Sequence, residues 1–219
     1  MPDAKPIHTI GIVGAGKVGT VLARLALAAG YEVLISGSGD PKRKALIIEM
    51  LAPGARVLTT AEVVAGADAV ILALPLRNVD QLPAELMRGK LVIDAMNYWE
   101  PIDGELPEYS RSALGTSEIV AGHLPGTRFV KAFSHLGYHD LDERGRPAGA
   151  TDRVAIAIAG NDEADVAATA SIIDALGFDP YLAGPLECGR AFQAHTPAFG
   201  YPLSLRALAE AIDKPLIRD

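Results

Sequence analysis

Residues 9–20 constrain the fold of this chain more than any other stretch, because they combine an apolar strand, a glycine-rich turn and a helix start. The apolar run at 9–13 predicts a buried strand. Gly14, Gly16 and Gly19 follow it as G-x-G-x-x-G, and apolar side chains then recur at helical spacings of three and four. A second apolar stretch follows the helix, so the N-terminus predicts a strand-helix-strand unit.

The three glycines have separate roles in a dinucleotide-binding turn. The first permits a tight turn, the second lets the backbone approach a pyrophosphate, and the third lets the helix pack closely on the strand. The start of the helix adds free N–H groups and a partial positive charge for phosphates. We therefore predict nucleotide binding, and the alternative is that the glycines serve only a tight structural turn.

Strand and helix patterns alternate along the rest of the chain, which is typical of an α/β protein. We predict a Rossmann-type doubly wound α/β fold with a mostly parallel sheet. The predicted strands are residues 9–13, 32–36, 55–59, 69–74, 91–93, 128–133, 154–159 and 179–182.

The end of the second strand distinguishes NADP from NAD. An NAD site usually has Asp or Glu at this position to bind the ribose 2′-hydroxyl, but Ser36 stands there instead. Gly37 and Ser38 follow it, and three cations occupy positions 42–44. Hydroxyl donors and positive charge suit a 2′-phosphate, which favours NADP. The alternative is that 42–44 is a solvated first helical turn.

Further candidate residues lie beyond the carboxyl ends of later strands, where open α/β sheets bind ligands. The predicted pocket residues are Asn97, Tyr98 and His135, although Tyr98 could instead anchor a surface loop and His135 could be structural. His139 lies four residues beyond His135, but Gly137 separates them in a predicted loop, so we do not predict a metal site. The predicted cofactor-binding residues are Gly14, Ala15, Gly16, Lys17, Val18, Gly19, Ser36, Gly37, Ser38, Lys42, Arg43, Leu74, Pro75, Leu76, Ala95, Met96 and Asn97.

Composition narrows the possible partners. The net charge of −7 disfavours a general nucleic-acid binder. No apolar run approaches the roughly 20 residues that span a bilayer, and the N-terminus does not resemble a signal peptide. Cys188 is the single cysteine, which excludes an internal disulfide and a cysteine-based metal cluster. We expect a cytoplasmic protein whose partners are small molecules, with no membrane or nucleic-acid partner.

The chain resembles the coenzyme F420-dependent NADP oxidoreductase family over nearly its whole length. The motifs that carry the resemblance are Gly14-Ala15-Gly16-Lys17-Val18-Gly19, the loop 36–38, Ala73-Leu74-Pro75-Leu76, the segment 92–98, Val130-Lys131-Ala132-Phe133 and Ala183-Gly184-Pro185-Leu186. Gly37-Ser38-Gly39 stands where members of the family often have Asn-Ser-Arg. The role of that arginine toward the 2′-phosphate would therefore pass to Lys42 or Arg43.

The resemblance implies an NADP-binding Rossmann domain at 1–133 and a small C-terminal α/β part at 134–219 that closes over the site and faces the substrate or deazaflavin. The two parts are expected to pack together as one compact unit. It implies NADP as cofactor, coenzyme F420 as a second one, and direct hydride exchange between them. Two alternatives stay open. One is an NADPH-dependent reductase of a small imine or carbonyl, with Tyr98, His135 or Tyr138 as proton donor; the other is a non-catalytic dinucleotide-binding module. The short chain also suggests a homodimer that completes the site.

Overall fold

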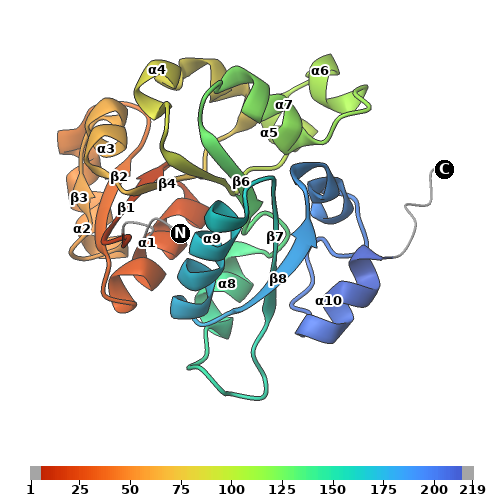
Figure 1. Cartoon of the computed structure of the whole chain (residues 1–219). Helices are drawn as coiled ribbons and strands as arrows, with labels where there is room; N and C mark the ends of the chain where they lie inside the picture. The colour runs from red at the N-terminus through yellow and green to blue at the C-terminus, as the bar shows by residue number, and fades with distance from the viewer. Residues whose placement is uncertain (1–5, 214–219) are drawn as a thin grey trace.

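The computed structural model describes residues 6–213 and contains one eight-stranded sheet with the order β3-β2-β1-β4-β5-β6-β7-β8 (Figure 1). The strands are β1 Thr9–Val13, β2 Glu32–Ser36, β3 Arg56–Val57, β4 Ala69–Leu72, β5 Leu91–Asp94, β6 Arg128–Ala132, β7 Ala155–Gly160 and β8 Asp179–Gly184. All neighbouring strands are parallel except β6 and β7, which are antiparallel. This confirms the predicted Rossmann-like, mostly parallel α/β fold.

Helices cover both faces of the sheet, as the fully buried central strands require. The α-helices are α1 Lys17–Ala28, α2 Pro41–Leu51, α3 Thr60–Gly66, α4 Ala84–Met87, α5 Glu100–Asp103, α6 Pro107–Ser110, α7 Thr116–His123, α8 Tyr138–Arg144, α9 Glu163–Ala175 and α10 Leu205–Ile212, and two 3₁₀ helices are η1 Leu76–Gln81 and η2 Leu186–Phe192.

Successive side chains of each strand enter different cores, because they alternate between the two faces of the sheet. In β4, Ile71 packs into the core under α1, α8 and α9, whereas Leu72 packs into the core under α3, α4 and α7. A third, smaller core joins β7 to η2 and α10 through residues such as Phe192 and Leu208. The sheet is therefore a rigid platform whose carboxyl edge is left to hold ligands.

One predicted loop is partly helical. The segment 134–140 was expected to be a loop because of Gly137, but Gly137 is the N-cap of α8, which begins at Tyr138. A glycine next to a helix start tolerates the extended conformation of a cap, and here it does not end a helix. As a result His139 belongs to α8 while His135 precedes it.

The predicted boundary at residue 133 falls between β6 and β7, and one continuous sheet crosses it. The division into 1–133 and 134–219 therefore stays a prediction. The chain leaves β6 through Phe133, which is buried and has a φ of 62°. Left-handed backbone is strained for a side chain of this size. Within residues 6–213, no helix is long and apolar enough to cross a membrane.

Candidate functional site

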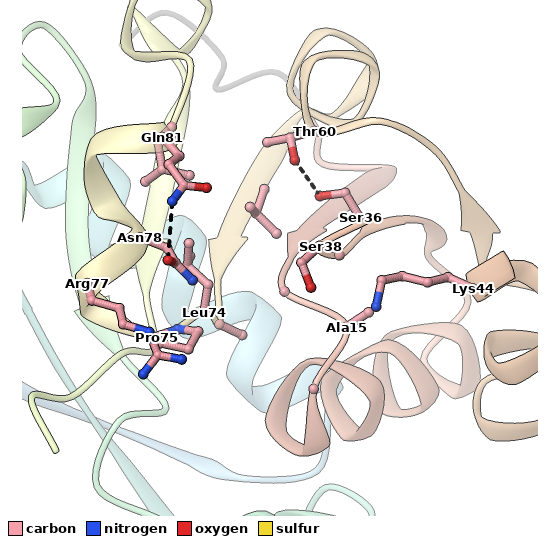
Figure 2. A pocket seen from close by; sticks show the side chains of 16 residues that line it. Ala15, Ser36, Ser38, Lys44, Thr60, Leu74, Pro75, Arg77, Asn78 and Gln81 are labelled. Carbon is pink, nitrogen blue, oxygen red and sulfur yellow. Dashed lines mark hydrogen bonds between the residues drawn. The ribbon is translucent and has the colours of Figure 1, made fainter. Parts of the chain in front are cut away.

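A cavity of about 450 Å³ opens at the carboxyl ends of β1, β2 and β4 (Figure 2). It lies where parallel α/β sheets bind nucleotides, beside the strand order reversal around β1. Its lining residues are Val13, Gly14, Ala15, Gly16, Ser36, Gly37, Ser38, Lys44, Thr60, Ala73, Leu74, Pro75, Arg77, Asn78, Gln81 and Leu82.

The glycine turn after β1 forms one wall of the cavity, and its three glycines have different surroundings. Gly14 has a φ of 125°, and a Cβ there would lie 2.1 Å from the carbonyl oxygen of Ala73. A Cβ on Gly19 would lie 1.7 Å from the carbonyl oxygen of Gly14. A Cβ on Gly16 would meet no atom within 4 Å in the described part of the chain. Packing thus accounts for Gly14 and Gly19, and the space beside Gly16 is left open.

The N-terminus of α1 meets the cavity at the same turn. Gly16 is its N-cap, no side chain caps the helix, and its first turn has no acidic residue. The first N–H groups of a helix have no partner within the helix, and together with the helix dipole they favour an anion.

The exit from β2 forms the opposite wall. Ser36 is buried, and its hydroxyl accepts a hydrogen bond from the Thr60 hydroxyl at 3.1 Å (Figure 2). A Cβ on Gly37 would lie 2.8 Å from Ala15 Cβ and 3.0 Å from Lys44 Cδ. The aliphatic part of half-buried Lys44 therefore lies against this loop, and Figure 2 shows the side chain extending back toward Ala15.

The structure changes the predicted choice of cation. Lys42 and Arg43 are exposed and do not line the cavity, whereas Lys44 does. The reason is the start of α2, where the Asp40 side chain accepts a hydrogen bond from the Lys42 N–H at 2.9 Å. Successive helical residues point about 100° apart, so the three cations of the first turn face different directions and Lys44 is the one turned toward the loop.

The charged side chains that line the cavity are all positive. Lys44 and Arg77 are cations, and none of the residues that line the cavity is a carboxylate. This contrasts with a chain whose net charge is −7. Asn78 and Gln81 add amides on the η1 side, where they are joined by a 3.3 Å hydrogen bond (Figure 2). Cations, hydroxyls, amides and free N–H groups around one space suit an anionic, polar ligand.

Nine of the seventeen predicted cofactor-binding residues are absent from the cavity lining: Lys17, Val18, Gly19, Lys42, Arg43, Leu76, Ala95, Met96 and Asn97. Leu76, Ala95 and Met96 are buried in the hydrophobic cores. Val18 packs against the core under α1. The ammonium of Lys17 donates to the Tyr138 hydroxyl at 3.1 Å and lies 4.9 Å from the centre of its ring.

The two polar candidates beyond β5 have different environments. The Tyr98 hydroxyl donates to the Gly104 carbonyl at 3.1 Å and accepts from the Leu106 N–H at 3.3 Å, so Tyr98 holds its own loop together. The Asn97 amide nitrogen donates to the Ser134 carbonyl, which joins the exits of β5 and β6. Asn97 Oδ1 and the Ser134 hydroxyl are buried and have no hydrogen-bond partner among residues 6–213.

His135 lies in the protein core and not in the cavity. Its side chain is 0% exposed, and Nε2 accepts a hydrogen bond from the Ala157 N–H at 3.0 Å. Burial, and then the nearby charge of Lys131, lowers the pKa of His135 to about 4, against a smaller opposing effect of the Ala198 backbone. The geometry favours a structural histidine. Within residues 6–213, no three His, Cys, Asp or Glu side chains are grouped to hold a metal ion.

Several lining residues were missed by the sequence analysis as cofactor-binding residues. Arg77 and Asn78 lie directly beyond the buried strand that ends at Leu74-Pro75, where the sequence predicts ligand binding, but they and Gln81 are not among the predicted cofactor-binding residues. Thr60 reaches Ser36 across 24 positions in the sequence, and no local pattern predicts that contact.

Comparison with known proteins agrees with this geometry. Residues 9–98 match the model of the family described as NADP oxidoreductase, coenzyme F420-dependent. The chain is similar to the structure of a hypothetical protein from Sinorhizobium meliloti, with a TM-score of 0.77 and 27% identity over 90% of this chain and 95% of that one. It is also similar to a candidate F420-dependent NADP reductase from Arthrobacter sp. FB24, with a TM-score of 0.69 and 24% identity over 84% and 87% of the two chains.

An imine reductase from Myxococcus stipitatus in complex with NADP⁺ has the same fold, with a TM-score of 0.60 and 20% identity. This chain matches only 57% of that longer protein, over 84% of its own length. The family match supports an NAD(P)-dependent oxidoreductase. The predicted resemblance to the coenzyme F420-dependent NADP oxidoreductases is confirmed by the match of residues 9–98 to that family.

Proposed function

We propose that this protein is an NADP-dependent oxidoreductase that transfers a hydride between NADP(H) and coenzyme F420 or a related acceptor. The observation that supports it most is the cavity lining, which combines two cations with the glycine turn and contains no carboxylate. The family match over residues 9–98 supports the same class.

The described residues fit NADP. The turn at Gly14–Gly16 and the N-terminus of α1 would hold the pyrophosphate, and the open space beside Gly16 admits it. Ser38 and Lys44 would hold the 2′-phosphate at the exit of β2, since a hydroxyl and an ammonium both donate to phosphate oxygens. A carboxylate that would bind a free 2′-hydroxyl is absent from the lining, which favours NADP over NAD.

Bound NADPH supplies the hydride, and the protein has to position the reacting groups and exclude water. An imine or carbonyl substrate would in addition require a proton donor. The Tyr98 hydroxyl donates within its own loop, the Tyr138 hydroxyl accepts from Lys17, and His135 is buried in the core. None of the three lines the cavity. Direct hydride exchange with F420 would require no such group from the protein.

The test is an absorbance assay of NADPH oxidation by the purified protein, with F420, with FMN and with no acceptor. NADH serves as the control cofactor. We expect F420-dependent oxidation of NADPH, with a preference over NADH of at least about tenfold from the charge-assisted bonds to the 2′-phosphate. Binding of NADPH without F420 turnover would overturn the acceptor and keep the cofactor. No binding of NADPH would overturn the proposal.

A homodimer that completes the site remains part of the proposal. Light scattering of the purified protein at assay concentration tests it, and a monomer that is fully active would contradict it.

A further inference from the structure

A buried charged network lies at the carboxyl ends of β5 and β6, outside the cavity. Asp94 and Lys131 are partners in the register of these strands and are 1% and 0% exposed. Ser117 of α7 bridges them, since its hydroxyl donates to Asp94 Oδ2 at 2.5 Å and accepts from Lys131 Nζ at 3.0 Å. Three segments far apart in the sequence thus form one network.

The same two charged side chains hold the backbone that leaves β5. Asp94 Oδ1 accepts a hydrogen bond from the Met96 N–H at 2.9 Å. Lys131 Nζ donates a hydrogen bond to the Met96 carbonyl oxygen at 3.5 Å. Both polar backbone groups of Met96 are therefore bound by the network. Asn97 comes next in the chain, and its amide nitrogen donates to the Ser134 carbonyl.

The Lys131 side chain packs closely against η2. A Cβ on Gly189 of η2 would lie 2.7 Å from Lys131 Cδ, and the ammonium lies 5.9 Å from the centre of the Phe192 ring. Burial lowers the pKa of Lys131, and Asp94 partly opposes that effect. A buried ion pair adds little net stability compared with apolar side chains, because desolvation offsets the attraction.

The network lies in line with the cavity. Val13, Leu72, Asp94 and Lys131 form one row across β1, β4, β5 and β6, and Val13 itself lines the cavity. A dinucleotide with its 2′-phosphate at the exit of β2 has to extend the other way, over β4 toward β5 and β6. Asn97 and Ser134 lie at those last two exits, and each has a buried polar atom that no other described residue hydrogen-bonds.

We propose that Lys131 is a positioning residue that, with Ser117 and Asp94, fixes the β5 exit at residues 95–97 for the nicotinamide end of the cofactor. The proposal rests on the proposed NADP function. Asn97 Oδ1 is an acceptor and the Ser134 hydroxyl can donate, which complements the two polar groups of a carboxamide. The strained backbone of Phe133, between Lys131 and Ser134, turns the exit of β6.

The test compares two probes on the full-length protein. NADPH has both ends of the cofactor, whereas adenosine 2′,5′-bisphosphate has the 2′-phosphate and lacks the nicotinamide. In Lys131→Met and in Ser117→Ala we expect the affinity for NADPH to fall about tenfold, as for loss of one charge-assisted hydrogen bond. We expect the affinity for the bisphosphate to stay within about twofold, because its site is the separate β2 exit.

The control is Thr169→Val, which removes a buried hydroxyl that donates to the Asp165 carbonyl within α9. It should leave the ratio of the two affinities unchanged. If Lys131→Met does not fold, the affinities of Ser117→Ala test the inference, because this variant keeps the charged side chains of both Asp94 and Lys131. An unchanged ratio in the variants, with wild-type NADPH binding intact, would overturn this inference alone. Failure of the wild type to bind NADPH would overturn both this inference and the proposed function.

Discussion

The two halves of the sheet's carboxyl edge are built in different ways. Over β2, β1 and β4 the edge is an open cavity, formed mostly by backbone and small side chains with two cations. Over β5 and β6 it is closed around Asp94 and Lys131, which are 1% and 0% exposed. The first half is formed by residues within 13–82, whereas the second depends on α7 and η2 packing onto the strands.

The largest effect that we expect comes from the third glycine of the first half. Gly19→Ala would place Cβ 1.7 Å from the Gly14 carbonyl oxygen, so α1 could not keep its distance from β1. Such a backbone clash should lower the free energy of unfolding by more than about 3 kcal/mol, at or beyond the upper end of usual overpacking costs. Urea unfolding measures it. A variant as stable as the wild type would show that the turn can shift, and would weaken the contrast between packed and open glycines.

In the second half, we expect the buried His135 to make the free energy of unfolding depend on pH. The pKa of His135 is lowered from 6.5 to about 4 in the folded protein, so between these values the unfolded chain binds the additional proton. The stability that neutral His135 contributes is complete above pH 6.5 and is lost as the pH falls through about 4. The loss should approach about 3 kcal/mol across that window.

Urea unfolding at several pH values tests this prediction in the wild type and in His135→Gln. The variant should lose this part of the pH dependence. His139→Gln is the matched control, because His139 is exposed on α8, and it should retain the dependence of the wild type. Equal profiles for the wild type and His135→Gln would contradict the burial argument.

The contrast between the two halves also explains what the sequence could predict. The mostly parallel α/β fold follows from alternating strand and helix patterns, and the glycine turn identifies the first half because its geometry is local. The sequence favoured Lys42 or Arg43, whereas Lys44 lines the cavity, because the exact start of α2 sets the direction of each cation. The bridge from Asp94 through Ser117 to Lys131 spans three elements, so no periodicity or spacing could indicate it.

We expect a smaller effect at Gly16, the second glycine of the turn. A substitution there should weaken cofactor binding and leave the free energy of unfolding nearly unchanged. Gly16→Ala meets no protein atom within 4 Å, and the residue has an extended backbone with a φ of −86°. Its stability should stay within about 1 kcal/mol of the wild type, as for other changes at an N-cap. The added methyl group would occupy the space proposed for the pyrophosphate, so NADPH affinity should fall about thirtyfold. Calorimetric titration beside urea unfolding measures both; unchanged affinity would place the ligand elsewhere.

The smallest effect that we expect is a difference in NADPH affinity between substitutions of Lys44 and Lys42, two of the three cations of α2. Lys44→Ala should lower the affinity for NADPH about tenfold and leave that for NADH within about twofold, because only NADPH has the 2′-phosphate. Lys42→Ala is the matched control: it removes the same side chain from the same helical turn, but at an exposed position outside the cavity lining. It should leave both affinities within about twofold, since exposed charges contribute little. The reverse result would be a loss of NADPH affinity in Lys42→Ala and none in Lys44→Ala. It would mean that α2 turns when the cofactor binds, and the open half of the edge would then be less rigid than the closed half.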